Sequence, residues 1–309
     1  MFNINDLAYA AGYIDGDGCL YLGTYQSSKQ TIYEYSMQVC SVDKYITDWL
    51  KNTFGGSVRK QKAIGNRRIP YVWTIKNQEA IKCAEAILPY LVAKHHEMQY
   101  WIEYAFHISD NDYLPLDQSM IEHRIALIAN IRKTKHELNM IENGYNKKLK
   151  NTYPSLSPQT EEFAYMAGLI DAEGCFRIKK WSPKNKPNHV YTISLEIGNT
   201  NKLFFDWLLL RFGGTLTFIK PKESNRKNSC TWSLQSKRLN FYLPLLVSFL
   251  KHKQPMCNKL IEFHKTIIPN GGDRHSRLFK ETYVNIIAKR EAIVEEIHIL
   301  NAKGHRSSL

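Results

Sequence analysis

Four acidic side chains occupy positions where they could hold a divalent metal ion. They form two pairs, each just before a glycine that suits a helix C-cap: Asp15 and Asp17 before Gly18, and Asp171 and Glu173 before Gly174. A helix ends in about half a negative charge, so an acid there costs a few tenths to about 1 kcal/mol. A divalent cation would offset this negative charge, and Mg²⁺ prefers one or two carboxylates together with phosphate oxygens. The alternative for either pair is a solvated Asp-Gly turn, but the occurrence of two pairs favours a metal site.

The segment that carries each acid pair is duplicated. Residues 8–19 (AYAAGYIDGDGC) return as residues 164–175 (AYMAGLIDAEGC), 156 positions later. Residues 48–57, which contain a Phe-Gly-Gly turn, match residues 206–215 at an offset of 158, and Trp73 has a counterpart 159 positions later. Because three landmarks return in the same order with nearly constant offsets, the chain is a tandem duplication.

Small residues recur every four positions along both duplicated segments. They are Ala8, Gly12 and Gly16 in the first copy and Ala164, Gly168 and Ala172 in the second. This spacing places them on one face of a helix. A glycine inside a helix costs roughly 0.5–1 kcal/mol relative to alanine, so its use in both copies indicates a packing need. We expect the two stripes to pack against each other and to form the interface between the copies.

Both copies predict the same order of elements. After the motif helix come two extended runs, and residues 34–39 and 192–197 alternate polar and apolar side chains as a half-buried strand does. An amphipathic helix (about 44–53 and 202–211), two more strands and further helical sequence follow. The expected fold is α+β, with two pseudo-symmetric αββαββα halves that each contain a four-stranded antiparallel sheet.

The domain organisation follows from a polar stretch between the copies. Residues 143–157 contain several lysines with glycine and proline, which is typical of a linker. Residues 1–142 then form the N-terminal repeat and residues 158–309 the C-terminal repeat. Each half closes with an amphipathic helix (about 121–138 and 280–300). We expect these helices to pack on the outer side of their own halves; a coiled-coil or dimerisation role is the alternative.

The duplicated motif is similar to that of a known enzyme family. Residues 11–18 (AGYIDGDG) and 167–174 (AGLIDAEG) resemble the motif that names the LAGLIDADG homing endonucleases, in their two-repeat, single-chain form. The resemblance extends over nearly the whole chain, since the Phe-Gly-Gly turns and a later lysine motif also fit. It implies a saddle of two four-stranded sheets that binds DNA.

The resemblance also implies a set of metal ligands. In the family, the last acid of each motif binds the catalytic metal with help from the backbone carbonyl of the preceding residue. Those acids are Asp17 and Glu173, and the carbonyls belong to Gly16 and Ala172. The earlier acids of the two motifs are then expected to have a structural or supporting role.

A lysine after a late helix of each repeat is a further family feature. Lys94, in the sequence KHHE, fits this pattern. In the second copy (KHKQ), Lys251 has the better spacing to the glutamine and Lys253 is the alternate. An ammonium beside the scissile phosphate would stabilise developing charge or orient water; an ordinary solvated lysine is the alternative. Asn199, and as a second candidate Ser41, lie at strand ends where the family often has a polar side chain that organises water.

The charge of the chain points to a polyanionic partner. The chain has 309 residues, with 42 basic against 29 acidic ones, a net charge of +13 and a pI near 9.3. Such an excess attracts nucleic acid first and an anionic membrane surface second. Strands fit the major groove, where arginine and lysine contact guanine. The candidate DNA-binding residues in strands and their loops are Arg59, Arg67, Arg68, Arg177, Lys179, Lys220 and Lys222. The alternative for any one of them is simple solvation.

The expected function is that of a site-specific homing endonuclease. The resemblance implies Mg²⁺-dependent cleavage of both strands of a long asymmetric DNA target with 3′ overhangs, by a monomer; Mn²⁺ or Ca²⁺ could occupy the same site. One alternative is an intron RNA maturase on the same fold, with the host intron RNA as partner. The other is a DNA-binding regulator that does not cut. The retained acids and lysines favour the nuclease.

Location can be addressed only through what the sequence lacks. No run of about 18 apolar residues, no signal peptide and no transit peptide is apparent, so we expect no membrane association. The six cysteines include no CxxC pair and are expected to be reduced thiols of an intracellular protein. A composition rich in Lys, Asn, Ile and Tyr is typical of an AT-rich genome, which suggests a mitochondrial or chloroplast protein if organelle-encoded and a cytoplasmic one otherwise.

Overall fold

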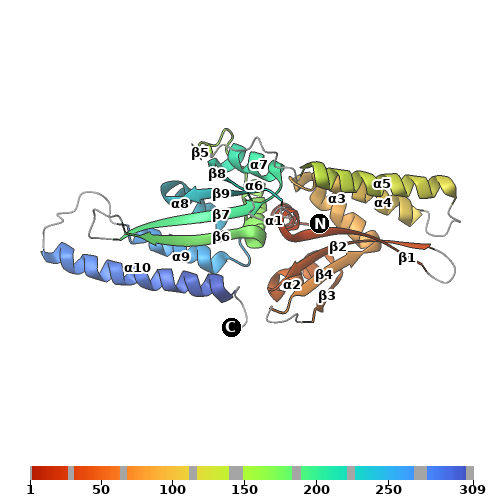
Figure 1. The fold of residues 1–309 in the computed structure, drawn as a ribbon. Coiled ribbons are helices and arrows are strands. Elements are labelled where there is room, and N and C mark those ends of the chain that lie inside the picture. Colours follow the sequence, from red (N-terminus) through yellow and green to blue (C-terminus); the bar gives the residue numbers. More distant parts are fainter. Residues whose placement is uncertain are drawn as a thin grey trace.

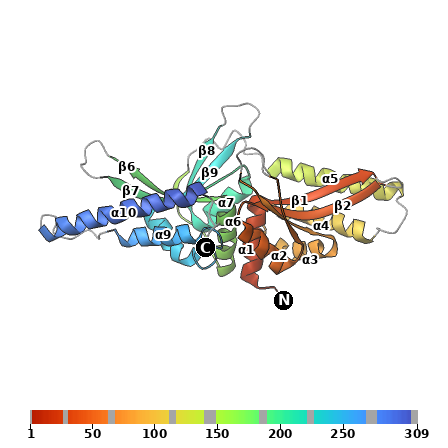
Figure 2. The same cartoon turned by 90° about the horizontal axis from the view of Figure 1, so that it is seen from below.

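The protein consists of two similar halves that meet at a central pair of helices, α1 and α6 (Figures 1 and 2). The computed structural model describes residues 2–26, 31–62, 68–110, 117–138, 149–182, 189–220, 227–267 and 277–303. None of the helices in this part of the chain combines the length and the apolar character that crossing a bilayer requires.

The N-terminal half contains one antiparallel sheet and its helices. The elements are α1 (Ile4–Asp17), β1 (Gly18–Gln26), β2 (Thr31–Ser41), α2 (Lys44–Phe54), β3 (Ser57–Lys60), β4 (Tyr71–Lys76), α3 (Asn77–Ile87), the 3-10 turn η1 (Leu88–Tyr90), α4 (His95–Asp110) and α5 (Gln118–Leu138). The strand order is β1-β2-β4-β3. Gly18 pairs with Val39, so β1 begins directly at the end of the motif helix.

The C-terminal half repeats this arrangement. The elements are β5 (Leu149–Thr152), α6 (Thr160–Glu173), β6 (Gly174–Trp181), β7 (Val190–Asn199), α7 (Lys202–Phe212), β8 (Gly214–Ile219), β9 (Ser229–Gln235), α8 (Ser236–Leu246), α9 (Gln254–Lys265) and α10 (Arg277–Lys303). The strand order is β5-β8-β9-β7-β6. Gly174 pairs with Ile197, which repeats the register at the start of β1.

The predicted αββαββα order and the two four-stranded antiparallel sheets are confirmed, with one addition. Residues 149–152, inside the predicted linker, form β5, which pairs with the outer edge of β8 as a fifth strand. The hydroxyl of Thr152 donates to the carbonyl of Gly214 at 3.1 Å, and Arg238 contacts the carbonyl of Thr152. The linker chain thus satisfies backbone groups that the edge of β8 would otherwise present to solvent.

In each half, a buried tryptophan of the sheet donates a hydrogen bond to the turn that follows α2 or α7. The indole nitrogen of Trp73 donates to the carbonyl of Gly55 at 2.9 Å, and that of Trp232 donates to Gly213 at 2.6 Å. Gly55 and Gly213 have positive φ angles of 86° and 64°, a conformation that favours glycine. The Phe-Gly-Gly turn and the tryptophan are therefore one structural unit, which explains why they were duplicated together.

The two long helices pack on their own halves, as expected. α5 lies on α4, and α10 lies on α9 and along the edge strand β6. Their arginines repeat the same contact: the guanidinium of Arg124 lies 4.4 Å from the ring centre of Tyr33, and that of Arg290 lies 5.8 Å from the ring centre of Tyr191. The duplication therefore includes these helices.

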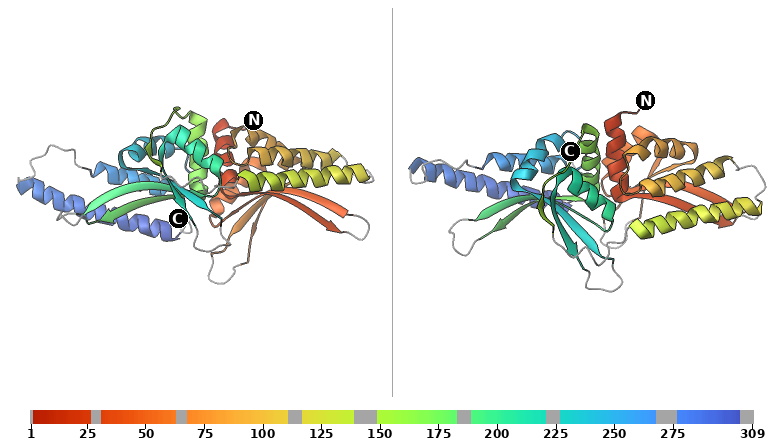
Figure 3. Two further views of the ribbon diagram at one scale, coloured as in Figure 1. Left: turned by 45° about the horizontal axis from the view of Figure 1, so that its top comes forward. Right: turned by 90° about the horizontal axis from the view of Figure 1, so that it is seen from above.

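The two sheets diverge from the central helix pair and together form one curved surface (Figure 3). Most helices lie on the other side of this surface. This arrangement is the saddle that the resemblance implies.

The stripes of small residues do form the interface between α1 and α6. A Cβ atom on Gly12 would lie 2.0 Å from the carbonyl oxygen of Tyr165, and one on Gly168 would lie 2.0 Å from that of Tyr9. Real Cβ atoms do not approach this closely, so only glycine lets each backbone contact the other.

The glycines after the acid pairs end their helices in an unexpected way. Gly18 and Gly174 are the C-caps of α1 and α6, but their φ angles of −76° and −75° are extended and not left-handed. A Cβ on Gly18 would lie 2.6 Å from the carbonyl oxygen of Ile14. Glycine is needed here for space rather than for conformational freedom.

We expect Gly12→Ala to destabilise the protein. The added methyl group would overlap the backbone of Tyr165, and overpacking of this kind costs about 1–3 kcal/mol. This loss should exceed the gain of roughly 0.5–1 kcal/mol from alanine in a helix. Chemical denaturation of the purified variant would measure the difference.

Gly198→Ala is the matched control. A Cβ at this position, on the exposed side of β7, would meet no atom closer than 3.9 Å. Its stability should stay within about 0.5 kcal/mol of the wild type. Equal stability of the two variants would contradict the close contact of α1 and α6.

Candidate active site

The acids that end the two motif helices lie together at the junction of the halves. α1 ends at Asp17 and α6 ends at Glu173. A Cβ on Gly16 would lie 2.5 Å from the Cβ of Ala172 and 3.2 Å from the Cγ of Glu173, so the two helix ends are in contact. Two acids that are 156 positions apart in the sequence are therefore neighbours in the fold.

The earlier acid of the first motif is a structural anchor. The buried carboxylate of Asp15 accepts backbone N–H groups of Val92, Ala93 and Lys94 at 2.8, 3.0 and 2.8 Å. It also accepts the hydroxyl of Tyr165, on the helix of the other half, at 2.7 Å. Four donors compensate the burial of its charge.

Asp171 repeats this arrangement in the second half. It accepts three consecutive backbone N–H groups, those of residues 251–253, at 2.7, 2.9 and 2.7 Å, and the hydroxyl of Tyr9 at 2.7 Å. Burial and the charge of Asp171 raise the pKa of Tyr9, so this hydroxyl keeps its proton and donates. Asp15 and Asp171 therefore join the two halves to each other and to the loops that carry the lysines.

Lys94 caps the end of α1. Its ammonium donates to the carbonyl oxygens of Ile14, Asp15 and Gly18 at 2.6, 2.9 and 2.8 Å. A positive charge at the negative end of a helix is stabilising. The cation that the acid-rich helix end requires is thus provided in part by this lysine.

Lys253, and not Lys251, is the counterpart of Lys94. The ammonium of Lys253 donates to the carbonyls of Ile170 and Asp171 at 2.8 and 3.0 Å. Lys251 points elsewhere: its ammonium lies 3.2 Å from a carboxylate oxygen of Asp6 and over the rings of Tyr9 and Trp49. The prediction of Lys251 is therefore wrong in position, and the alternate Lys253 takes its place.

The spacing to the glutamine was the misleading signal. Gln254 donates to the carbonyl of Val247 at 3.1 Å, and His95 contacts the carbonyl of Leu88 at 3.1 Å, so Gln254 corresponds to His95. The offset of 159 between the two buried tryptophans, applied to Lys94, leads directly to residue 253.

The two polar residues at strand ends use their oxygens in local turns. Oδ1 of Asn199 accepts the N–H groups of Thr200 and Asn201 at 2.7 and 2.9 Å. Oγ of Ser41 accepts the hydroxyl of Tyr13 at 3.3 Å and the N–H of residue 43 at 3.1 Å. A role of either residue in organising water stays a prediction.

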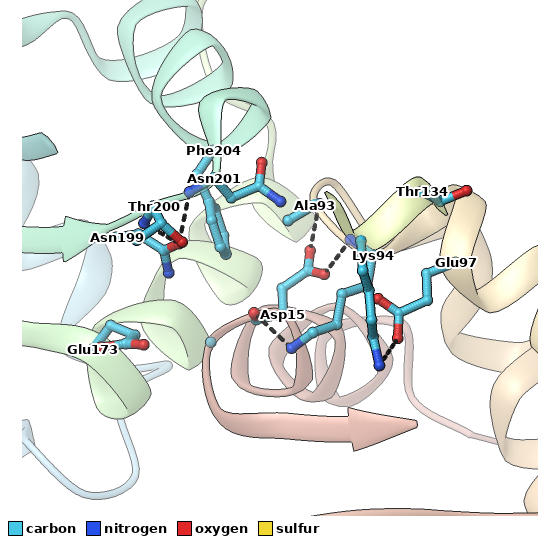
Figure 4. A pocket seen from close by; sticks show the side chains of 12 residues that line it. Asp15, Ala93, Lys94, Glu97, Thr134, Glu173, Asn199, Thr200, Asn201 and Phe204 are labelled. Carbon is cyan, nitrogen blue, oxygen red and sulfur yellow. Dashed lines mark hydrogen bonds and ion pairs between the residues drawn. The ribbon is translucent and has the colours of Figure 1, made fainter. Parts of the chain in front are cut away.

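A cavity of about 310 Å³ joins the two halves at this place (Figure 4). Glu173 and Asn199 line it from the C-terminal half, and Gly16, Lys94 and Glu97 line it from the N-terminal half. In Figure 4, Glu173 lies opposite Lys94 and Glu97 across the hollow. The cavity can accept a group that both halves contact.

The charges around the helix ends oppose one another. Desolvation raises the pKa of Glu173, and the negative charge of Asp17 raises it further. Asp17 is exposed, but partial desolvation raises its pKa as well. The positive charges of Lys253 and Lys94 lower this pKa and offset part of the rise. Burial lowers the pKa of Lys94 and of Lys253. The acids therefore carry their charge at a cost, which a bound cation would reduce.

The oxygen atoms present fit a hard divalent cation. Two carboxylates lie beside the predicted carbonyl ligands Gly16 and Ala172, and Lys94 contacts other carbonyls than that of Gly16. Within the described ranges there is no group of three or more His, Cys, Asp or Glu side chains that could hold a metal ion. Mg²⁺ or Ca²⁺ at this point would complete its coordination with water or phosphate oxygens.

Five of the predicted DNA-binding residues lie in the described part of the chain, and all five are exposed. They are Arg59 on β3, Arg68 before β4, Arg177 and Lys179 on β6, and Lys220 after β8; Arg67 and Lys222 lie outside the described residues. Glu196 on β7 pairs with both Arg177, at 3.4 Å, and Lys179. The sequence pattern did not indicate this acid, because Glu196 lies on the neighbouring strand, where it pairs with Cys175 and its carboxylate reaches both basic side chains.

Comparison with known proteins places the fold. No family model and no curated protein matches the sequence. Among solved structures, I-SmaMI bound to an uncleaved DNA target in the presence of calcium ions has a TM-score of 0.62 at 15% identity, with 93% of this chain and 98% of that chain covered. The LAGLIDADG homing endonuclease I-GzeII in complex with a DNA target has a TM-score of 0.62 at 15% identity, with 94% and 98% covered. I-LtrWI, another LAGLIDADG homing endonuclease bound to target DNA, has a TM-score of 0.61 at 17% identity, with 94% and 98% covered.

We expect Asp17→Asn and Glu173→Gln each to raise the melting temperature at neutral pH in buffer without divalent cations. Each acid has a higher pKa in the fold than in the unfolded chain, so stability is lost as the pH rises above about 4 and the acids ionise. The variants lack this loss. Below about pH 4 the difference from the wild type should vanish, and thermal melts across pH would show it.

Asp48→Asn controls for the change in net charge. Asp48 is a surface acid on α2 that pairs with Lys44 at 2.5 Å, away from the helix ends. This variant should gain no stability at neutral pH. If Asp17→Asn or Glu173→Gln proved less stable than the wild type at neutral pH, the electrostatic description of the junction would be incorrect.

Proposed function

We propose that the chain, which has the fold of the LAGLIDADG homing endonucleases over nearly its whole length, is a site-specific DNA endonuclease. The observation that carries this proposal is the contact between the ends of α1 and α6, which puts Asp17 and Glu173 at one point. That point lies between the two sheets of a basic protein (Figure 3). The reaction is hydrolysis of one phosphodiester bond in each strand of a DNA duplex.

Asp17 and Glu173, with the carbonyls of Gly16 and Ala172, would hold divalent cations, with Mg²⁺ as the proposed ion and Mn²⁺ or Ca²⁺ as substitutes. When bound, such an ion activates water and stabilises the leaving 3′ oxygen. The raised pKa values of both acids support the assignment, because desolvation makes their charged forms costly and a bound cation would reduce that cost. The calcium ions in the structure of I-SmaMI with DNA agree with this choice of ion.

Lys94 and Lys253 hold the two helix ends in position. Each ammonium contacts the carbonyls just before the catalytic acid, so the lysine fixes the backbone that presents the acid. The same positive charges oppose the rise in the pKa of both acids that desolvation causes. A scissile phosphate that approaches the acids would meet two cations that are already oriented.

The pseudo-symmetry supports cleavage of both strands by one chain. Each half supplies one acid and one lysine, so a monomer contains two equivalent centres. Two centres that lie side by side suit a staggered cut across the minor groove, with 3′ overhangs. The two sheets and their loops would contact a long asymmetric target in the major groove. Arg59 and Lys220 are among their exposed basic residues.

Replacement of the acids should abolish cleavage without loss of DNA binding. We expect Asp17→Asn and Glu173→Gln to slow the cutting of target DNA in Mg²⁺ by more than about 100-fold, since even indirect metal partners contribute 10–100-fold. Incubation of the wild type with a library of DNA duplexes, followed by sequencing of the ends, would supply the target. Removal of Mg²⁺ with a chelator should stop the reaction of the wild type.

The same assay separates the alternatives. Binding of duplex DNA without cleavage would indicate a regulator, and tight binding of an intron RNA without DNA cleavage would indicate a maturase. If both acid variants still cut, the assignment of the acids is wrong.

The lysines can be tested with a matched set of three variants. Lys94→Met and Lys253→Met should each slow cleavage by about 100-fold or more, because the end of one helix loses its cation. Lys251→Met should cut at nearly the wild-type rate, since the Lys251 ammonium contacts Asp6 and aromatic rings instead. Rates on the two separately labelled strands would be measured for each. A severe loss in Lys251→Met with normal cutting by Lys253→Met would reverse the assignment.

A further inference from the structure

The surroundings of the two lysines differ, although the lysines themselves are equivalent. Three positions after Lys94 stands Glu97, on α4; three positions after Lys253 stands Met256, on α9. Both residues are 4% exposed. A buried carboxylate at one centre therefore corresponds to a buried thioether at the other.

The long helices α5 and α10 extend this difference. The arginine contacts establish their register, because Arg124 and Arg290 lie over equivalent tyrosines and the offset between them is 166. The buried side chains Leu127 and Ile131 correspond at the same offset to Ile293 and Ile297. Lys135, near the end of α5, then corresponds to Asn301, near the end of α10.

At the first centre these positions form an ion pair. The ammonium of Lys135 lies 2.9 Å from Oε1 of Glu97, and the Lys135 side chain is 42% exposed. Both residues line the cavity that also contains Lys94 and Glu173. Figure 4 shows Glu97 beside Lys94 in this cavity. The carboxylate of Glu97 is buried and fixed on a helix, so it holds the flexible lysine at the wall of the cavity.

At the second centre the corresponding side chains are uncharged. The amide nitrogen of Asn301 donates to the carbonyl of Phe176 at 2.9 Å, and Oδ1 of Asn301 lies 3.9 Å from the sulfur of Cys175. The contacts of Asn301 are thus with the start of β6. Met256 is an apolar residue of the core.

We propose that Lys135, held by Glu97, positions the DNA phosphate at the Lys94 centre, and that the strand at this centre is therefore cut before the other strand. An ammonium has three donors and forms charge-assisted hydrogen bonds with phosphate oxygens. Lys135 faces the hollow between the halves, where a phosphate must lie to reach Glu173 and Lys94. The Lys253 centre has no charged residue at the corresponding positions, so it lacks this contact.

The inference rests on the proposed nuclease function, and strand-resolved kinetics test it. The target duplex carries a different label on each strand, and Lys94→Met assigns a strand to the Lys94 centre as the one whose cutting it slows more. In the wild type we expect this strand to be cut first, with a nicked duplex as intermediate. Wild-type strands cut at equal rates would overturn the inference and leave the nuclease proposal intact, whereas a wild type that cuts no duplex would end both.

A reciprocal exchange of side chains separates positioning from folding. The double variant Glu97→Met and Lys135→Asn installs the residues of the second centre at the first without leaving a buried charge unpaired. We expect cutting of the first strand to slow by about tenfold, the scale of one charge-assisted hydrogen bond, and cutting of the other strand to be unchanged. The KM for the duplex should change little, because the other basic residues of the protein contribute most of the DNA binding.

Three outcomes would contradict the proposal, and one further variant should support it. A purely structural role would slow both strands together and lower the melting temperature. An unchanged ratio of strand rates in the double variant would mean that Lys135 does not act on the phosphate. The single variant Lys135→Met, which leaves Glu97 without its cation, should reproduce the shift in strand ratio; the opposite shift would also overturn the proposal.

Discussion

The structure depends on the direct contact between the backbones of α1 and α6. Gly12 and Gly168 each face a carbonyl oxygen of the other helix at a distance that excludes any side chain. Large side chains would separate the helices, and the acids at their ends would then lie too far apart to share a cation. The hydroxyls of Tyr9 and Tyr165 reinforce the contact, because each donates to the buried acid of the opposite half. The contact between α1 and α6 therefore forms both the interface between the halves and the candidate active site.

The meeting of the two helix ends concentrates negative charge, which the nearby lysines compensate only in part. The helix ends, Asp17 and Glu173 are all negative, whereas Lys94 and Lys253 are committed to backbone carbonyls. The lysines therefore stabilise the helix ends by contacting the backbone next to the acids. Desolvation raises the pKa of both acids, and the charge of Asp17 raises that of Glu173 further. A site built in this way favours a cation together with a polyanion, which is the requirement of metal-dependent DNA cleavage.

The sequence predicted the features that repeat and missed those that depend on the third dimension. Periodicity and duplication were sufficient for the αββαββα order and for the meeting of Asp17 with Glu173, since both follow from helix geometry and symmetry. The strand β5 was missed because it forms only where the edge of β8 is available. Lys253 was predicted only as the alternate to Lys251, because the local pattern around Gln254 competed with the global offset of 159. The pairing of Glu97 with Lys135 connects two helices and leaves no trace in local spacing.

The two halves are symmetric in the residues around α1 and α6 and differ in the residues next to them. Four sets of groups around the two helices are matched in the other half: the glycines, the tyrosines, the anchoring acids and the capping lysines. The glycines, the tyrosines and the anchoring acids contact the other half directly, so a change in any of them would alter both halves at once. Side chains one step further out differ between the halves: Glu97 pairs with Lys135, whereas Met256 is an apolar residue of the core. They can differ without disturbing the contact between α1 and α6. The asymmetric DNA target proposed above would not require them to match.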